Sequence, residues 1–274
     1  MLSKFKTLAL ACALTVAGIG GAAAEVVYHR GNSGDPETLD QHKTSVITEA
    51  HILRDLYEGL VIYDAKAKVI PGVATSWDLS ADGKVYTFKL RDDAKWSNGD
   101  PVVAGDFVYS FRRIMNPETG AKYANILFPM LNAEKINKGE MKPEELGVKA
   151  IDDHTLEITL EAATPFFIEL LTHQTGLPVH PASVEKLGSD FVKPGNMVSN
   201  GAYTLAEFVP NSHIKVVKNP MFHDAANVQI DTVMFYPTED RSAALQRFQA
   251  GELDSNDDIP TEQIKFIKEN LGKQ

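Results

Sequence analysis

Cysteine is nearly absent from this 274-residue chain, and the one cysteine, Cys12, lies in an apolar N-terminal segment that we expect to be removed. The rest of the chain can then form no disulfide, no thiol nucleophile and no cysteine-ligated metal site. Runs of lysine and arginine are also missing, which argues against nucleic acid as a partner. The 27 basic and 37 acidic residues give a formal net charge of −10. They are interspersed, as on a solvated surface.

Catalytic and metal-binding motifs are scarce as well. Ser183 and Lys186 have the SxxK spacing, but the other motifs of the enzymes that use it are missing, and the serine opens an ordinary helix. The eight histidines are scattered along the chain without the spacing of a metal site. We therefore predict a protein that is not an enzyme and that uses no metal or cofactor.

The first 24 residues have the plan of a secretory signal peptide. Lys4 and Lys6 precede an apolar run at 8–19, and three alanines ending at Ala24 match an A-x-A cleavage site. The apolar run is too short for a convincing membrane span. We predict export with cleavage after Ala24, which would leave 25 basic and 37 acidic residues and a net charge of −12. A lipid anchor at Cys12 stays open as the less favoured alternative, because the residues before it match a lipoprotein signal poorly.

A block at 71–113 carries several turn and strand signals in a fixed order. It reads PGVATSWDLSADGKVYTFKLRDDAKWSNGDPVVAGDFVYSFRR. The Asp-Gly pair at 82–83 predicts a turn, after which the chain doubles back into a strand at 85–90. The strand alternates with a period of two, and the face that carries Tyr86 and Phe88 is the expected inner one.

The same block ends in a predicted helix. An Asn-Gly pair at 98–99 marks a second turn, and Pro101 suits the first turn of a helix at 101–115 because its missing N–H is not needed there. Apolar side chains then recur at helical spacing, which predicts a core stripe: Val103, Phe107, Phe111 and Ile114.

The pattern over the whole chain is a mixture of α and β. The strands that we expect are at 25–29, 85–90, 155–160, 203–208, 213–217 and 232–236. The expected helices are at 48–60, 101–115, 165–171, 181–187, 241–250 and 261–271, and Asp240 is the predicted N-cap of the fifth. Both hairpin and crossover connections occur in this order, so we predict a mixed rather than a purely parallel sheet.

The block at 71–113 resembles the signature of the bacterial extracellular solute-binding proteins of the oligopeptide and dipeptide class. The likeness continues in GVKAIDDHTLEITL from Gly147, in the segment from Pro194 to Asp224, and in FQAGELD from Phe248. It therefore covers the chain from the predicted mature N-terminus nearly to the end. Within the class, the oligopeptide-binding branch is the most similar.

This resemblance implies an α/β fold of the type II periplasmic-binding-protein kind, with two lobes hinged around a ligand. By analogy, 25–57 and 183–274 belong to the first lobe, and 58–182 form a subdomain inserted into it. The family's second lobe is absent, so the chain has the extent of an N-terminal half. In the family, that lobe supplies the acidic anchor for the amino terminus of the peptide.

The resemblance also suggests ligand-binding residues, because members of the class bind a peptide backbone as an added strand. One contact strand falls at Ser45, Val46 and Ile47, for which an ordinary loop with an N-cap at Thr48 is the alternative. Tyr123 falls where the family places an aromatic contact from the insert, and a half-buried surface tyrosine is its alternative. The last group is the turn Asn256, Asp257 and Asp258, which a solvated acidic turn would also explain.

The function that follows is the peptide-binding subunit of an ATP-driven importer, which captures oligopeptides in the periplasm and delivers them to an inner-membrane ABC permease. We expect a monomer that performs no chemistry on its ligand. A single-lobe scaffold protein that has lost transport remains an alternative. Dipeptides, cell-wall peptides, nickel chelates and haem also remain open as ligands, since the family reuses one scaffold.

Overall fold

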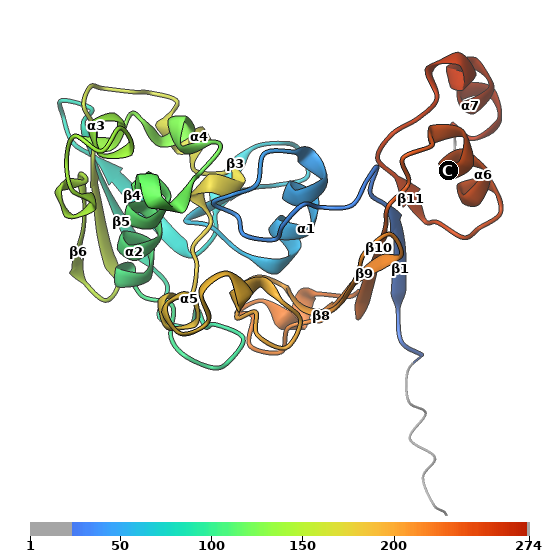
Figure 1. Cartoon of the computed structure of the whole chain (residues 1–274), viewed down its shortest axis with the longest axis horizontal. Coiled ribbons are helices and arrows are strands. Elements are labelled where there is room, and N and C mark those ends of the chain that lie inside the picture. Colours follow the sequence, from blue (N-terminus) through green and yellow to red (C-terminus); the bar gives the residue numbers. More distant parts are fainter. Residues whose placement is uncertain (1–23, 273–274) are drawn as a thin grey trace, which may run out of the picture.

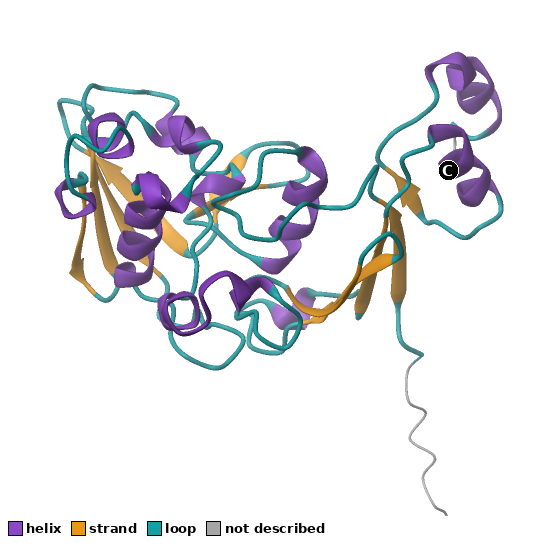
Figure 2. Cartoon of the chain, viewed as in Figure 1, coloured by secondary structure: helices purple, strands orange, loops and turns teal. Residues whose placement is uncertain are grey.

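The computed structural model describes residues 24–272. The predicted signal peptide and Cys12 lie outside the described residues, apart from Ala24 itself. None of the helices within this range is long and apolar enough to cross a membrane. Two main sheets lie towards opposite ends of the long axis, and helix α1 (Ile47–Leu56) lies between them (Figures 1 and 2).

The first sheet has five strands in the order β11-β1-β10-β9-β8. Strand β1 pairs in parallel with β10 and β11, whereas β10 with β9 and β9 with β8 are antiparallel. The sheet is therefore mixed, as predicted. Its strands are β1 (Val27–Gly31), β8 (Tyr203–Val209), β9 (His213–Lys218), β10 (Thr232–Tyr236) and β11 (Ser255–Asn256).

The second sheet has four antiparallel strands in the order β4-β5-β7-β6, and helix α2 packs against β6 and β7. A separate two-stranded sheet joins β2 and β3. The bounds are β2 (Val61–Tyr63), β3 (Val69–Pro71), β4 (Ala74–Leu79), β5 (Val85–Leu90), β6 (Val148–Asp152), β7 (Thr155–Thr159) and α2 (Ala104–Met115).

The predicted hairpin and its inner face are confirmed. Strands β4 and β5 pair across a turn in which Gly83 has φ +70°, a conformation that favours glycine. Tyr86 and Phe88 are buried, whereas Thr87 and Lys89 on the opposite face are more exposed, so the alternation places the aromatic face in the core. Phe88 packs near Trp77 of β4, with ring centroids 6.4 Å apart.

The core stripe of α2 is confirmed at Phe107, Phe111 and Ile114, which are all buried, but the predicted start of this helix is wrong. The helix begins at Ala104, and Pro101 instead forms an isolated bridge with Lys95. The start is fixed three residues later because the Asp106 carboxylate accepts the N–H of Val103 (3.1 Å) and that of Trp96 Nε1 (2.9 Å).

The other predicted helices lie close to their expected positions, and the helix at 181–187 has its predicted bounds, whereas α3 was not predicted. Helix α1 stops at Leu56 rather than residue 60 because Tyr57 is extended and leads into β2. The last helix starts at Ile264, after a single 3₁₀ turn. Asp240 caps α6 as predicted and accepts the N–H groups of Ser242 and Ala243. The bounds are α3 (Ala133–Asn137), α4 (Phe167–Leu170), α5 (Pro181–Leu187), α6 (Arg241–Gln249) and α7 (Ile264–Asn270).

Candidate functional site

The segment that leads into α1 is anchored by a buried carboxylate. Glu49 is 1% exposed, and it accepts the backbone N–H groups of Glu37 (3.2 Å), Ser45 (2.9 Å) and Val46 (3.1 Å). Val46, rather than the expected Thr48, is the N-cap, because the helix already begins at Ile47. The donors of residues 45 and 46 are therefore used inside the protein.

Two other backbone groups of this segment stay available. The carbonyl of Ser45 and the N–H of Ile47 have no hydrogen-bond partner within residues 24–272, and Val46 between them is extended (φ −124°, ψ 161°). A free carbonyl and a free N–H two residues apart are what an added strand needs for pairing. The side chains beside them are exposed, Val46 to 47% and Ile47 to 57%, so a ligand can reach this position.

The turn after β11 is tied to α1 and β1. Asp257 accepts a hydrogen bond from Arg30 Nη2 (2.7 Å), and its other carboxylate oxygen lies 2.8 Å from His51 Nδ1, within ion-pair distance. Asn256 pairs with Gly31 in the sheet, and Asp258 bonds to Arg241 (2.6 Å). The carboxylates of Asp257 and Asp258 are thus ion-paired within the protein. Their contact with a ligand stays a prediction.

The pKa values of two carboxyls in this cluster shift in opposite directions. Burial opposes ionisation of Asp257, but hydrogen bonds from His51 and Arg30 outweigh it and hold the pKa of Asp257 below its usual value. Asp55 lies one helical turn beyond His51. Its desolvation raises its pKa to about 6, although the nearby charges of Arg30 and His51 oppose the shift.

Tyr123 directly precedes the 3₁₀ turn at Ala124–Leu127. It is 39% exposed, and its ring stacks on His173 with the centroids 5.9 Å apart. Lys122, the preceding residue, pairs with the carboxylate of Glu37 (2.7 Å), whose own N–H is bound by Glu49. Direct contacts therefore link the Tyr123 region to the segment at 45–47, just as His51 links α1 to Asp257.

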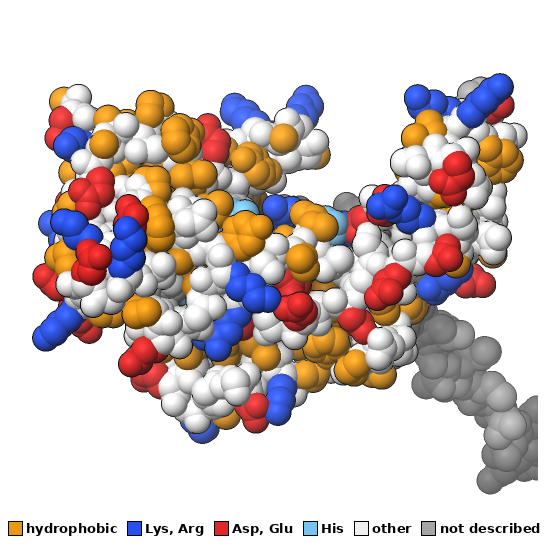
Figure 3. Space-filling model, turned by 45° about the horizontal axis from the view of Figure 1, so that its top comes forward, with side chains coloured by type: hydrophobic (Ala, Val, Ile, Leu, Met, Phe, Trp, Pro, Cys, Tyr) orange, Lys and Arg blue, Asp and Glu red, His pale blue; other side chains and the backbone are white. Residues whose placement is uncertain are grey.

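The segment at 45–47 and the turn at 256–258 thus contact α1 directly, whereas Tyr123 is connected to it only through Lys122 and Glu37. Figure 3 shows the surface hollowed between the main body of the molecule and the arm that carries α6 and α7. Two apolar side chains of that arm are exposed, Ile259 to 42% and Phe266 to 44%.

Sequence reasoning missed three residues that hold this site together: Arg30, Glu49 and His51. Glu49 had a local signal, since an acidic residue at the third position of a helix can bond back to the N-cap backbone. The others had none, because their contacts join segments about 200 residues apart.

The SxxK serine has a structural role. Ser183 is 8% exposed, and both its Oγ (2.8 Å) and its N–H (3.3 Å) bond to Nδ1 of His180, the N-cap of α5. His180 Nε2 lies 3.2 Å from Asp100, so the side chains of Ser183, His180 and Asp100 form a connected series like that of a catalytic triad. The helix cap accounts for the arrangement, because the imidazole nitrogen that faces Ser183 is already accepting its backbone N–H. Within residues 24–272 no group of three or more His, Asp or Glu side chains is placed to bind a metal ion.

Comparison with known proteins gives a consistent result. The periplasmic oligopeptide-binding protein OppA of Escherichia coli is 42% identical over 245 residues, which are 88% of this chain and 45% of that protein. Haemophilus influenzae OppA, solved in complex with the peptide RPPGFSPFR, superposes with a TM-score of 0.88 at 40% identity and covers 91% of this chain. The Escherichia coli murein tripeptide binding protein MppA has the same TM-score at 38% identity and covers 92%.

In each comparison the chain spans about half the length of the relative. The mixed α/β fold and the likeness to one half of a periplasmic binding protein are thereby confirmed. Residues 68–274 match the model of the bacterial extracellular solute-binding proteins, family 5 Middle. The chain belongs to this family of bacterial solute-binding proteins.

Proposed function

We propose that this chain is the peptide-binding N-terminal half of a periplasmic binding protein that supplies oligopeptides to an inner-membrane ABC permease. The observation that supports this most is the free Ser45 carbonyl and Ile47 N–H on an exposed, extended segment that Glu49 holds in place. Such a segment binds the backbone of a peptide and leaves the side chains unspecified, which suits a protein that accepts many sequences.

The rest of the function follows from the relatives and belongs to the same proposal. The chain would be exported to the periplasm, cleaved after Ala24 and monomeric. Residues 25–57 with 183–274 would form the first lobe, and residues 58–182 the inserted subdomain. A peptide lying along residues 45–47 would reach Tyr123 on one side and the turn at 256–258 on the other. Capture would be completed by closure of a second lobe over this face.

The backbone contact can be tested with a proline substitution. Ile47 is the first residue of α1, where proline is tolerated because the N–H is not needed by the helix. The Ile47→Pro variant should therefore fold but lose the donor. Its affinity for tri-alanine should fall by about threefold to tenfold relative to Ile47→Ala, which lacks the same side chain but keeps the N–H.

The measurement is an NMR titration of ¹⁵N-labelled protein with tri-alanine at millimolar concentration. We expect amide shifts at 45–47 and 256–258 that saturate with the peptide. Equal affinity of the proline and alanine variants would contradict strand pairing at Ile47. Shifts confined to other parts of the chain would contradict the assignment of this face as the peptide site.

A further inference from the structure

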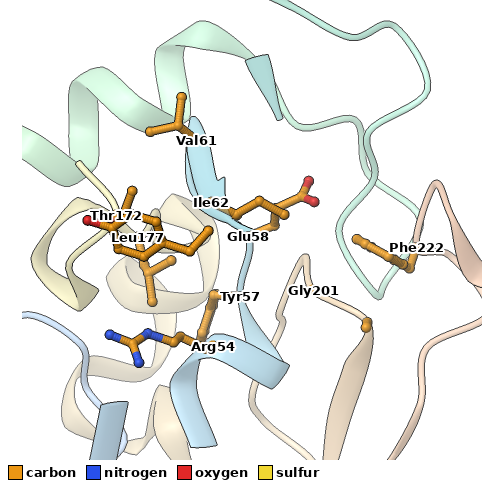
Figure 4. Close-up of a pocket in the computed structure, with 11 residues that line it drawn as sticks. Arg54, Tyr57, Glu58, Val61, Ile62, Thr172, Leu177, Gly201 and Phe222 are labelled. Carbon is orange, nitrogen blue, oxygen red and sulfur yellow. The ribbon is translucent and has the colours of Figure 1, made fainter. Parts of the chain in front are cut away.

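A cavity of about 290 Å³ opens at the C-terminal end of α1, the end opposite to the segment at 45–47. It lies where the last turn of α1 meets β2 and the segment that begins β8 (Figure 4). Its volume is near the lower limit of ordinary ligand pockets, which is about 300 Å³. A single small molecule fits this space, whereas a peptide of several residues does not.

The wall of the cavity is mostly apolar. Val61 and Ile62 of β2 line it together with Leu177 and Phe222, which come from distant parts of the sequence. A hydrophobic body would therefore lose contact with water on several sides when it enters, and this favours binding in proportion to the apolar area buried. Ala202 lines the same space, so a larger side chain at that position would fill it.

One end of the cavity carries a charge that the protein does not neutralise. Arg54 is exposed at the cavity, and none of the ion pairs within residues 24–272 includes it. Glu58, the acid in the wall, is engaged elsewhere, because its carboxylate lies 2.9 Å from His223 Nε2. Figure 4 shows the two side chains pointing in opposite directions. An anionic ligand group would therefore find an unpaired guanidinium beside the apolar wall.

We propose that this cavity binds a small organic acid, with one carboxylate on Arg54 and an apolar body of about the size of a phenyl ring against Ile62, Leu177 and Phe222. Thr172, which also lines the cavity, donates its hydroxyl to the carbonyl of Glu169 (2.7 Å), so recognition of the carboxylate would depend on Arg54. Arg54 lies two helical turns beyond Ile47, so the cavity is apart from the segment at 45–47, although Thr172 in its wall precedes His173, on which Tyr123 stacks. Its ligand would contact both α1 and the start of β8.

The test uses three probes that share one apolar body. The purified protein, labelled with ¹³C at Ile, Leu and Val methyl groups, is titrated with 3-phenylpropionate, 3-phenylpropan-1-ol and 3-phenylpropylammonium. We expect methyl shifts at Ile62 and Leu177 with all probes that bind. The acid should bind about fivefold more tightly than the alcohol, the gain expected of one charge-assisted hydrogen bond at a partly exposed site. The ammonium should bind most weakly.

Variants separate the charge from the cavity. Arg54→Gln should reduce affinity for the acid about fivefold and leave the alcohol unchanged, whereas Arg112→Gln, at a half-buried arginine that does not line this cavity, should change neither. Ala202→Leu should abolish binding of both. Equal affinity for acid and alcohol, an unaffected Arg54→Gln variant, or shifts that avoid Ile62 and Leu177 would overturn the proposal.

The outcome is independent of the proposed peptide binding. In the Ala202→Leu variant, tri-alanine should still shift the amides at 45–47 to the same extent as in the wild type. Loss of the organic-acid site with retained peptide shifts would therefore count against this cavity alone. If tri-alanine causes no amide shifts at 45–47 in the wild type, that result would contradict the proposed peptide site and leave the cavity proposal unaffected.

Discussion

At the scale of single residues, the cluster around Asp257 shows how one carboxylate can join three elements. Its two oxygens are taken by Arg30 of β1 and His51 of α1, and the residue itself directly follows β11. Each of these groups would be poorly solvated alone, and pairing offsets the loss of water. Asp55 beside them forms no ion pair within residues 24–272, and its raised pKa reflects that difference.

The pKa of Asp55 predicts a defined pH dependence of stability. The folded-state pKa of about 6 exceeds the ordinary value of 3.8, so the native protein holds this proton more tightly than the unfolded chain does. Stability from this group therefore falls as the pH rises from about 4 to 6 and stays reduced above 6. Asp55→Asn should match the wild type near pH 4 and exceed it by about 2 kcal/mol at pH 7.

Urea denaturation at several pH values measures this difference. Asp257→Asn is the matched control of opposite sign, because the pKa of Asp257 is lowered. That variant should be less stable than the wild type at pH 7, and the gap should close as the pH falls below about 4. An Asp55→Asn variant that is less stable at pH 7 would show that the charge of Asp55 stabilises the fold.

At the scale of elements, the entry to α1 is the feature that matters most for the proposed function. A single buried side chain, Glu49, organises three backbone donors from two parts of the preceding loop. The same helix start is joined to the end of β1, because the Asn32 amide donates to the carbonyl of Thr48 (3.0 Å). The segment at 45–47 is thus held in place by Glu49 and Asn32, which would lower the conformational entropy lost when a ligand binds there.

Substitution of Glu49 should loosen this segment. Glu49→Ala leaves three backbone N–H groups without their acceptor, and we expect a loss of about 3 kcal/mol in the free energy of unfolding. Glu49→Gln keeps one acceptor oxygen and should fall between that variant and the wild type. Hydrogen exchange of the amides of Ser45 and Val46 should be faster in Glu49→Ala.

Thr48→Ala provides the control, because it changes the neighbouring residue and keeps the carboxylate. Its exchange rates at 45 and 46 should equal those of the wild type. Unchanged exchange at these two amides in Glu49→Ala would show that the loop holds its conformation without Glu49, and the positioning role would then be lost.

At the scale of the whole molecule, the chain would offer one face of the proposed peptide site. It spans about half the length of the relatives that it matches. Exposed apolar side chains at Ile259 and Phe266 lie on the arm that borders the hollow in Figure 3. A peptide on this face would stay solvated on its other side, so its hydrogen bonds would compete with water and contribute little net affinity.

We therefore expect the isolated chain to bind peptides weakly. Isothermal titration calorimetry with tripeptides to pentapeptides should detect no binding at micromolar concentration, although NMR shifts appear at millimolar concentration. The reason is that hydrogen bonds in a water-exposed groove gain about 1 kcal/mol each at most, against several kcal/mol of lost motional freedom. A micromolar dissociation constant would instead indicate a complete site on one lobe.

The sequence by itself determined the features that are encoded within a few neighbouring residues. The β4–β5 hairpin follows from the Asp-Gly turn and the alternation after it, and the core face of α2 follows from its apolar spacing. The cap at Asp240 and the family membership were also accessible from local patterns. The wrong helix start at Pro101 has a local cause too, since Asp106 rather than proline chemistry fixed it.

Only the tertiary structure decided which distant groups meet. Strand β11 has two residues and exists because β1 lies beside it, and the partners of Asp257 come from segments about 200 residues away. The cavity beside Arg54 likewise combines side chains from four separate segments. No periodicity or turn signal records such contacts, because they depend on how whole elements pack, and side-chain chemistry is completed only after that packing has formed.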